Sequence, residues 1–162
     1  MSLHVLRPGL ASRVVDLGRP ASRSLGVPVG GAVDQSALRL ANALLGNDPG
    51  AAALEVMLAG PRLAADAEHL AVFWGQGFEL RINHSPYPVG KSFQLQSGDR
   101  LEVLPTPHAT CGYLCVAGGV AAPATLGSRS AFATIAAGDV LEAAPSRGPA
   151  RFLDGMGHPP GP

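Results

Sequence analysis

Two short segments combine residue types that could bind a small anion. Asp16 and Arg19 are separated by a leucine and a glycine, so the guanidinium could pair with the carboxylate across a turn or stay free to bind a carboxylate or carbonyl of a ligand. A second segment, residues 126–130, places Ser128, Arg129 and Ser130 beside a glycine. It lacks the glycine spacing of a nucleophile elbow. The pattern therefore predicts either a binding site for a carboxylate or phosphate, or an exposed loop.

A glycine-dense stretch, residues 26–31, precedes the clearest helix of the sequence. Its backbone N–H groups could bind an anion at the start of that helix. Asp34 is well placed to cap the same N–H groups, and its charge would repel an anion. The alternative is that the glycines only permit a tight bend between a strand and the helix.

Metal and nucleotide sites are not indicated by the sequence. The five histidines show no ligand spacing. The Val89 to Ser92 stretch resembles the end of a phosphate-binding loop, but an alternating strand follows it where a helix is required. Cys111 and Cys115 would lie roughly 13 Å apart along one face of a strand, too far for a disulfide. We expect two free thiols.

The length, composition and charge of the chain limit the classes of protein to which it can belong. The chain has 162 residues, 46% of them hydrophobic and 15% charged, with a net charge of zero. This predicts one domain with a substantial core and argues against binding to nucleic acid or to an anionic membrane. The sequence contains no apolar run of membrane length and no secretory leader pattern. We therefore expect a soluble cytoplasmic protein.

The predicted elements are mostly short strands. Alternating or apolar stretches indicate strands near residues 14–15, 54–58, 70–74, 78–83, 93–96, 100–104, 113–117 and 140–141. One amphipathic helix is expected over about 34–46, capped by Asp34 and ended by Gly46 and Asn47. The pattern predicts a mainly β sandwich or barrel spanning residues 1–144. Residues 145–162 are rich in Pro and Gly, which is typical of a flexible tail.

Several motifs in a fixed order resemble a known family. They are DLGRP at 16–20, LGVP at 25–28, GAVD at 31–34, ALRLAN at 37–42, GN at 46–47, ALE at 53–55, GP at 60–61, VAGGV at 116–120, LGSRS at 126–130 and AGDVL at 137–141. The chain thereby resembles the N-terminal half of the biotin-dependent carboxyltransferase family. This is the allophanate hydrolase subunit 2-like group, which includes the C subunit of bacterial ATP-dependent 5-oxoprolinase.

The resemblance implies a cyclophilin-like β-barrel module with one principal helix. It also implies a subunit of a heteromeric carboxyltransferase or amidohydrolase acting on a cyclic amide or urea-like substrate, and inactive alone. Partners would be a subunit 1-like protein and an A-type subunit. No cofactor of its own is expected, although ATP or carboxybiotin could act through the complex. The substrate-binding candidates carried over are Asp16, Arg19, Asp34, Asn42, Glu55, Ser128 and Arg129.

Departures from the family pattern keep other interpretations open. Trp74 to Gly77 stand where the family often has a turn with a carboxylate, and the usual glycine- and phenylalanine-rich loop is nearly missing between Ser130 and Ala136. Family chains are also longer. These differences favour an alternative, a non-catalytic regulatory or interaction module that pairs with a subunit 1-like, kinase-inhibitor-type partner. A third interpretation is a shortened product whose exposed apolar surface limits its solubility.

Overall fold

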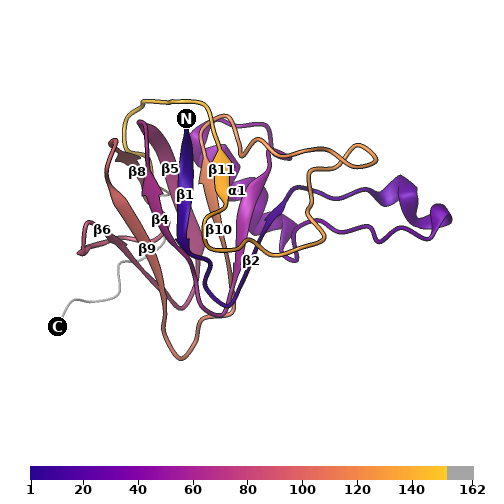
Figure 1. Cartoon of the computed structure of the whole chain (residues 1–162), viewed down its shortest axis with the longest axis horizontal. Helices are drawn as coiled ribbons and strands as arrows, with labels where there is room; N and C mark the ends of the chain where they lie inside the picture. Colours follow the sequence, from indigo (N-terminus) through magenta and orange to yellow (C-terminus); the bar gives the residue numbers. More distant parts are fainter. Residues whose placement is uncertain (153–162) are drawn as a thin grey trace.

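The structure, a computed structural model of the chain, describes residues 1–152 as a mainly β fold with one principal helix (Figure 1). The described elements are β1 (Ser2–Arg7), β2 (Ala11–Val15), the 3-10 helix η1 (Pro20–Leu25), α1 (Gln35–Leu45), β3 (Ala53–Met57), β4 (Arg62–Ala65), β5 (His69–Gly75), β6 (Phe78–Ile82), β7 (Ser85–Tyr87), β8 (Ser92–Leu95), β9 (Arg100–Pro105), β10 (Cys111–Val116) and β11 (Val140–Glu142).

The strands form two antiparallel sheets. The first sheet has the order β11-β1-β4-β9-β6-β7, and the second has the order β2-β3-β10-β5-β8. All eight strands expected from the sequence are confirmed, although some differ in extent. The strands β1, β4 and β7 were not predicted, although Leu3 and Val5 of β1 alternate with more exposed neighbours and are both buried. The mainly β class is therefore confirmed.

The expected barrel is not closed in residues 1–152. The edge strands β2 and β11 do not pair with each other. Instead, residues between β10 and β11 occupy the free edge of β2: the N–H of Ala131 donates to the carbonyl of Val14, and the N–H of Ile135 donates to that of Ser12. A connecting segment thus takes the hydrogen-bonding groups that a closing strand would need, and the result is a two-sheet sandwich.

The core has two layers of apolar side chains. One layer lies between the sheets and includes Leu54, Phe73, Leu80 and Leu114. The other lies between the second sheet and α1, and includes Leu38, Ala41, Val72, Tyr113 and Cys115. Residues of β5 and β10 contribute alternately to the two layers because successive side chains of a strand point to opposite faces. Both cysteines are free thiols, as predicted.

Helix α1 begins and ends where the sequence predicts. The Asp34 carboxylate accepts the N–H of Ala37 at 2.9 Å, which caps the first turn. Gly46 adopts a left-handed conformation and ends the helix. Leu38, Ala41, Leu44 and Leu45 form the buried face that packs on β5 and β10. The helix therefore covers the outer face of the second sheet. Within residues 1–152, no helix is both long enough and apolar enough to cross a membrane.

Part of the predicted tail contacts the edge of the second sheet. Ser146 accepts the N–H of Leu70, and Ser92 exchanges hydrogen bonds with Arg151. Phe152 forms an isolated bridge with Lys91. The hydrogen bonds of Arg151 with Ser92 cover part of the free edge of β8. The rest of the predicted tail, residues 153–162, lies outside the described residues, and the domain boundary at 145 stays a prediction.

Candidate functional site

Two long connections meet at one end of the sandwich. Residues 17–33, which we call the arm, join β2 to α1 and carry η1 at their tip. Residues 119–138, which we call the crossing loop, join β10 to β11. Figure 1 shows the purple arm extending away from the sheets, with the orange crossing loop beside its base. Asp16, Arg19, Ser128 and Arg129, four of the seven candidate residues, lie where the two connections meet.

Asp16 ties the crossing loop to the end of β2. Its carboxylate accepts hydrogen bonds from the hydroxyls of Ser128 at 2.6 Å and Ser130 at 2.8 Å. It also accepts the backbone N–H groups of Arg129 at 2.6 Å and of Gly18 at 2.7 Å. Partial burial by itself would raise the pKa of Asp16, but these four donors outweigh it and hold the pKa below its usual range. The carboxylate is therefore charged near neutral pH, and its oxygens accept hydrogen bonds from groups of the same chain.

Arg19 is buried and does not pair with Asp16. The residue is only 3% exposed, and among the ion pairs of residues 1–152 there is none between Arg19 and a carboxylate. The guanidinium donates instead to the carbonyls of Thr125 at 3.0 Å and Ser130 at 2.5 Å. It also lies 4.6 Å from the ring centre of Phe132. The predicted ion pair between Arg19 and Asp16 is therefore wrong. The carbonyl groups that Arg19 binds belong to its own chain.

Ser128 and Arg129 have different surroundings. Ser128 is buried, and its hydroxyl accepts the N–H of Ser130 while donating to Asp16. Arg129 is exposed, and its guanidinium contacts the carbonyl of Ala122. Arg129 therefore keeps a positively charged side chain at the surface, where a ligand could reach it.

The glycines of the arm have a steric explanation. Gly18 and Gly31 both adopt positive φ, at +83° and +88°. A Cβ atom on Gly18 would lie 2.8 Å from the carbonyl oxygen of Gly30, and one on Gly31 would lie 2.8 Å from the nitrogen of Gly18. The two sides of the arm are thus in backbone contact at its base, which only glycine permits. This favours the tight-bend interpretation of the glycine-dense stretch.

A second cluster surrounds Glu55 and holds the other end of the arm. Glu55 is 0% exposed, and Arg13, Glu55 and Tyr113 lie side by side across β2, β3 and β10. The Glu55 carboxylate accepts the hydroxyl of Tyr113 at 3.1 Å, the Nε–H of Arg13 at 3.2 Å and the N–H of Val33 at 2.8 Å. A buried carboxylate is tolerated because these donors satisfy it.

Tyr113 is a residue that sequence reasoning missed. Its hydroxyl accepts the N–H of Asp34 at 2.8 Å while donating to Glu55. Burial raises the pKa of Tyr113 well above its usual range, so the phenol stays protonated and remains a donor. Burial likewise raises the pKa of the neighbouring Cys111 thiol. The available signal was a tyrosine within an apolar strand; its pairing with Glu55 depends on strand register.

Asn42 lies apart from both clusters. It is fully buried in α1, where it donates to the carbonyl of Ala51 at 2.9 Å and accepts the side-chain N–H of Asn47 at 2.9 Å. Asn47 in turn donates to the carbonyl of Val116. These contacts fasten the end of α1 to β10. Substrate binding by Asn42, as by the other six candidates, stays a prediction.

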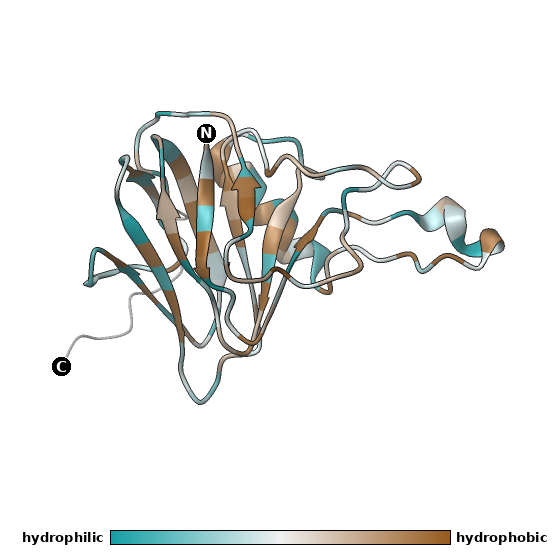
Figure 2. Ribbon diagram, in the orientation of Figure 1, coloured by the Kyte–Doolittle hydropathy of each residue, from teal (hydrophilic) through white to brown (hydrophobic). Residues whose placement is uncertain are grey.

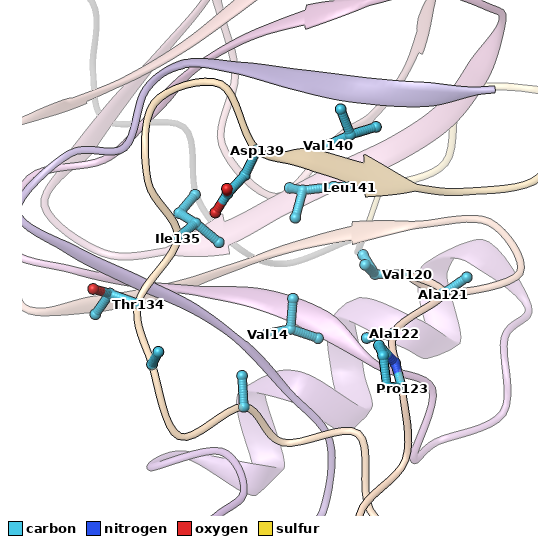
Figure 3. A pocket seen from close by; sticks show the side chains of 12 residues that line it. Val14, Val120, Ala121, Ala122, Pro123, Thr134, Ile135, Asp139, Val140 and Leu141 are labelled. Atoms are coloured by element: carbon cyan, nitrogen blue, oxygen red, sulfur yellow. The ribbon is translucent and has the colours of Figure 1, made fainter.

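A shallow cavity of about 290 Å³ opens between β2, β11 and the crossing loop (Figure 3). Val14, Val120, Ile135 and Leu141 make much of its wall apolar, and Thr134 and Asp139 supply polar groups. The Asp139 carboxylate accepts the N–H of Ala136 at 2.8 Å. None of the seven candidates lines this cavity. Within residues 1–152, no cluster of three His, Cys, Asp or Glu side chains could hold a metal ion.

The two sheets, with one principal helix and two connections joined at their bases, define a β-sandwich module. The chain belongs to the family described as carboxyltransferase domain, subdomain A and B, whose model matches residues 25–150.

Individual relatives agree with this assignment. The chain is 35% identical to the C subunit of 5-oxoprolinase from Escherichia coli over 128 residues, which are 79% of this chain and 41% of the relative. It is 34% identical to the urea amidolyase of Lachancea kluyveri over 82% of this chain and 7% of that protein. The crystal structure of TTHA0988 superposes with a TM-score of 0.89 at 36% identity, covering 98% of this chain and 63% of that one. The chain thus spans about two fifths of the length of the Escherichia coli relative.

Proposed function

We propose that this chain is a counterpart of the 5-oxoprolinase C subunit within a heteromeric hydrolase or carboxyltransferase, and that it is inactive without its partners. The observation that carries the proposal is the 35% identity to the Escherichia coli relative over 79% of the chain. The partners would be a subunit 1-like protein and an A-type subunit. Such a complex would work in the cytoplasm.

The proposed substrate is a cyclic amide such as 5-oxoproline, or a urea-like amide. The sequence similarity to both a 5-oxoprolinase subunit and a urea amidolyase supports an amide substrate, because each name refers to an enzyme that acts on an amide bond. ATP or carboxybiotin would be handled by the assembled complex, and no cofactor is assigned to this chain alone.

The hydrogen-bonded groups around Asp16 and around Glu55 have the proposed role of fixing the shape of a binding surface. Asp16, Arg19 and Ser128 fix the crossing loop, and Glu55 fixes the end of the arm. This leaves the Arg129 guanidinium exposed at the junction. We assign to Arg129 the contact with a substrate carboxylate or carbonyl, because a guanidinium offers several donors in a fixed plane.

The test is reconstitution of activity. The chain is purified with its subunit 1-like and A-type partners, and ATP-dependent hydrolysis of 5-oxoproline is measured with and without it. We expect turnover only when the chain is present. Arg129→Ala is expected to lower kcat/KM by at least about ten-fold, which is about 1.4 kcal/mol of transition-state binding. Arg7→Ala, which removes an exposed arginine from β1, is the matched control.

The alternative is a non-catalytic regulatory module that binds a subunit 1-like partner. One observation favours it. The side chains of Asp16, Arg19 and Glu55 all form hydrogen bonds with other groups of the same chain. A stable complex whose hydrolysis rate is the same with and without the chain would support this alternative over the catalytic proposal.

A further inference from the structure

The cavity between β2, β11 and the crossing loop has no part in the proposed function. Its volume of about 290 Å³ lies just below the roughly 300–1,000 Å³ of sites for drug-sized molecules, so it suits a smaller ligand. Val14 comes from the second sheet, Leu141 from the first, and Ile135 from the crossing loop (Figure 3). A ligand in this cavity would therefore contact both sheets at the edge where the barrel is not closed.

Most of the cavity wall is apolar. Val14, Val120, Ile135, Val140 and Leu141 contribute aliphatic side chains, and four alanines and a proline extend the same wall. Figure 2 shows the hydrophobic stretch of β11 in brown. Val140 is 48% exposed, so part of this wall faces solvent. A short aliphatic chain would take apolar surface of the wall and its own out of water, which favours binding.

Among the described residues that line the cavity, Asp139 alone is charged. Its backbone N–H donates to the carbonyl of Ala136 at 3.1 Å, and its carbonyl accepts the N–H of Val5 at 2.9 Å. Its Oδ2 atom accepts the N–H of Ala136 at 2.8 Å. Within residues 1–152, Oδ1 accepts no hydrogen bond and the carboxylate has no ion-pair partner. Asp139 therefore offers a firmly held oxygen to a cationic donor.

Charged groups beside the cavity do not cancel this carboxylate. Arg13 points to the opposite face of β2, where it pairs with a buried glutamate. The other charged residues within two positions of a lining residue are Asp16, Arg129 and Glu142. Arg129 contacts the carbonyl of Ala122 and supplies one positive charge, against two negative charges from the others. The charge around the cavity is therefore negative.

We propose that this cavity binds a primary ammonium group carried on a short aliphatic chain. Oδ1 of Asp139 accepts an N–H of the ammonium, and the apolar wall contacts the carbon atoms. The same carboxylate repels an anion, and a neutral ligand gains only the apolar contact. This chemistry is that of a free alkylamine or of a lysine side chain. The site is separate from the substrate contact assigned to Arg129, so its test does not depend on the proposed function.

The experiment compares three probes that share a four-carbon chain and differ in charge. The ¹⁵N-labelled full chain is titrated with n-butylammonium chloride, 1-butanol or sodium butyrate, and binding is followed by amide chemical shifts. We expect saturable shifts at the lining residues and a millimolar Kd for n-butylammonium. This Kd should be at least about five-fold lower than the Kd of either other probe.

Two pairs of variants test whether binding occurs in this cavity. Asp139→Asn keeps an oxygen acceptor for the Ala136 N–H but removes the charge, and it should abolish the preference for n-butylammonium. Glu142→Gln, at an exposed position of β11 outside the lining, is its control. Ala131→Leu fills the cavity and should raise the Kd at least about five-fold. Ala124→Leu, at an exposed position of the crossing loop outside the lining, should change it less than about two-fold.

Three results would overturn the proposal. Absence of saturable binding would show that the cavity takes no such ligand. Butyrate or 1-butanol binding as tightly as n-butylammonium would show that the carboxylate does not select a cation. An unchanged Kd in Ala131→Leu would place the binding elsewhere. Circular dichroism melts verify that the variants fold, and the comparison of probes on the wild type decides the question of charge even if Asp139→Asn does not fold.

The source of the ammonium group is distinguished by a fourth probe, Nα-acetyl-lysine methylamide. Tighter binding of this probe than of n-butylammonium would support a lysine side chain of another protein as the ligand. Weaker binding would support a free alkylamine, because the backbone of the lysine derivative then hinders entry.

Discussion

The carboxylate of Asp16 accepts a hydrogen bond at 2.6 Å from the hydroxyl of Ser128, 112 residues further along the chain. This contact closes the base of the arm against the crossing loop. In this chain, candidate site residues stabilise the positions of connections.

Replacing Asp16 by Asn should destabilise the fold. The amide keeps one acceptor oxygen but brings an NH₂ group toward donors, so at least one N–H or hydroxyl loses its partner. We expect the free energy of unfolding to fall by about 1–3 kcal/mol, measured by urea denaturation. Glu142→Gln, at an exposed position of β11, is the control and should change it by less than about 0.5 kcal/mol. Equal losses in both variants would contradict this role.

The stabilisation by Asp16 should depend on pH. Its pKa in the folded chain is lowered from the ordinary value of 3.8, so the folded state favours the charged form. The stabilisation is therefore fully present above the unfolded value and is lost as the pH falls below 3.8 through the folded pKa. The difference in unfolding free energy between wild type and Asp16→Asn should be constant from about pH 5 to 7 and shrink below about pH 4. A difference that grew on acidification would refute this.

Tyr113→Phe should be more destabilising than Tyr87→Phe. Removing the Tyr113 hydroxyl leaves the Asp34 N–H without its acceptor and takes a donor from the buried Glu55 carboxylate. Removing the Tyr87 hydroxyl breaks a single 2.9 Å hydrogen bond to the carbonyl of Ser92. We expect losses of about 2–3 and about 1 kcal/mol in urea denaturation. The reverse order would show that Glu55 does not depend on Tyr113.

Asp34→Ala should weaken the start of α1. The variant loses the cap on the Ala37 N–H, and we expect a loss of about 0.5–2 kcal/mol, measured as a lower Tm and converted with the unfolding enthalpy. Asp34→Ser keeps an oxygen acceptor and should retain most of the stability. If serine proves as harmful as alanine, the carboxylate has a function other than capping.

Asn42 and Asn47 should act as one unit. Their side chains share a 2.9 Å hydrogen bond, and each also binds a backbone carbonyl. In a double-mutant cycle of Asn42→Ala and Asn47→Ala, we expect a coupling energy of about 0.5–3 kcal/mol in the free energy of unfolding. Additive losses would mean that the two residues stabilise the helix end independently.

The local pattern of the sequence was sufficient for most elements. Alternation in residues 78–82 and 100–104, and the Asp34 and Gly46 caps, each depend on neighbours within a few positions. The same reasoning missed β7, because three residues including a proline carry almost no periodicity. The family resemblance implied a β-barrel module, whereas the free edge of β2 is filled by the crossing loop.

Sequence patterns alone predicted the mainly β class, the position and caps of α1, the free cysteines and, through the ordered motifs, the carboxyltransferase family. The hydrogen-bond partners of the charged residues depend on the three-dimensional fold. Asp16 meets Ser128, Arg19 turns to backbone carbonyls, and Glu55 meets Tyr113 across a strand pair. Strand and helix periodicity act between near neighbours in the sequence, whereas a hydrogen bond between distant residues depends on how sheets and connections are brought together.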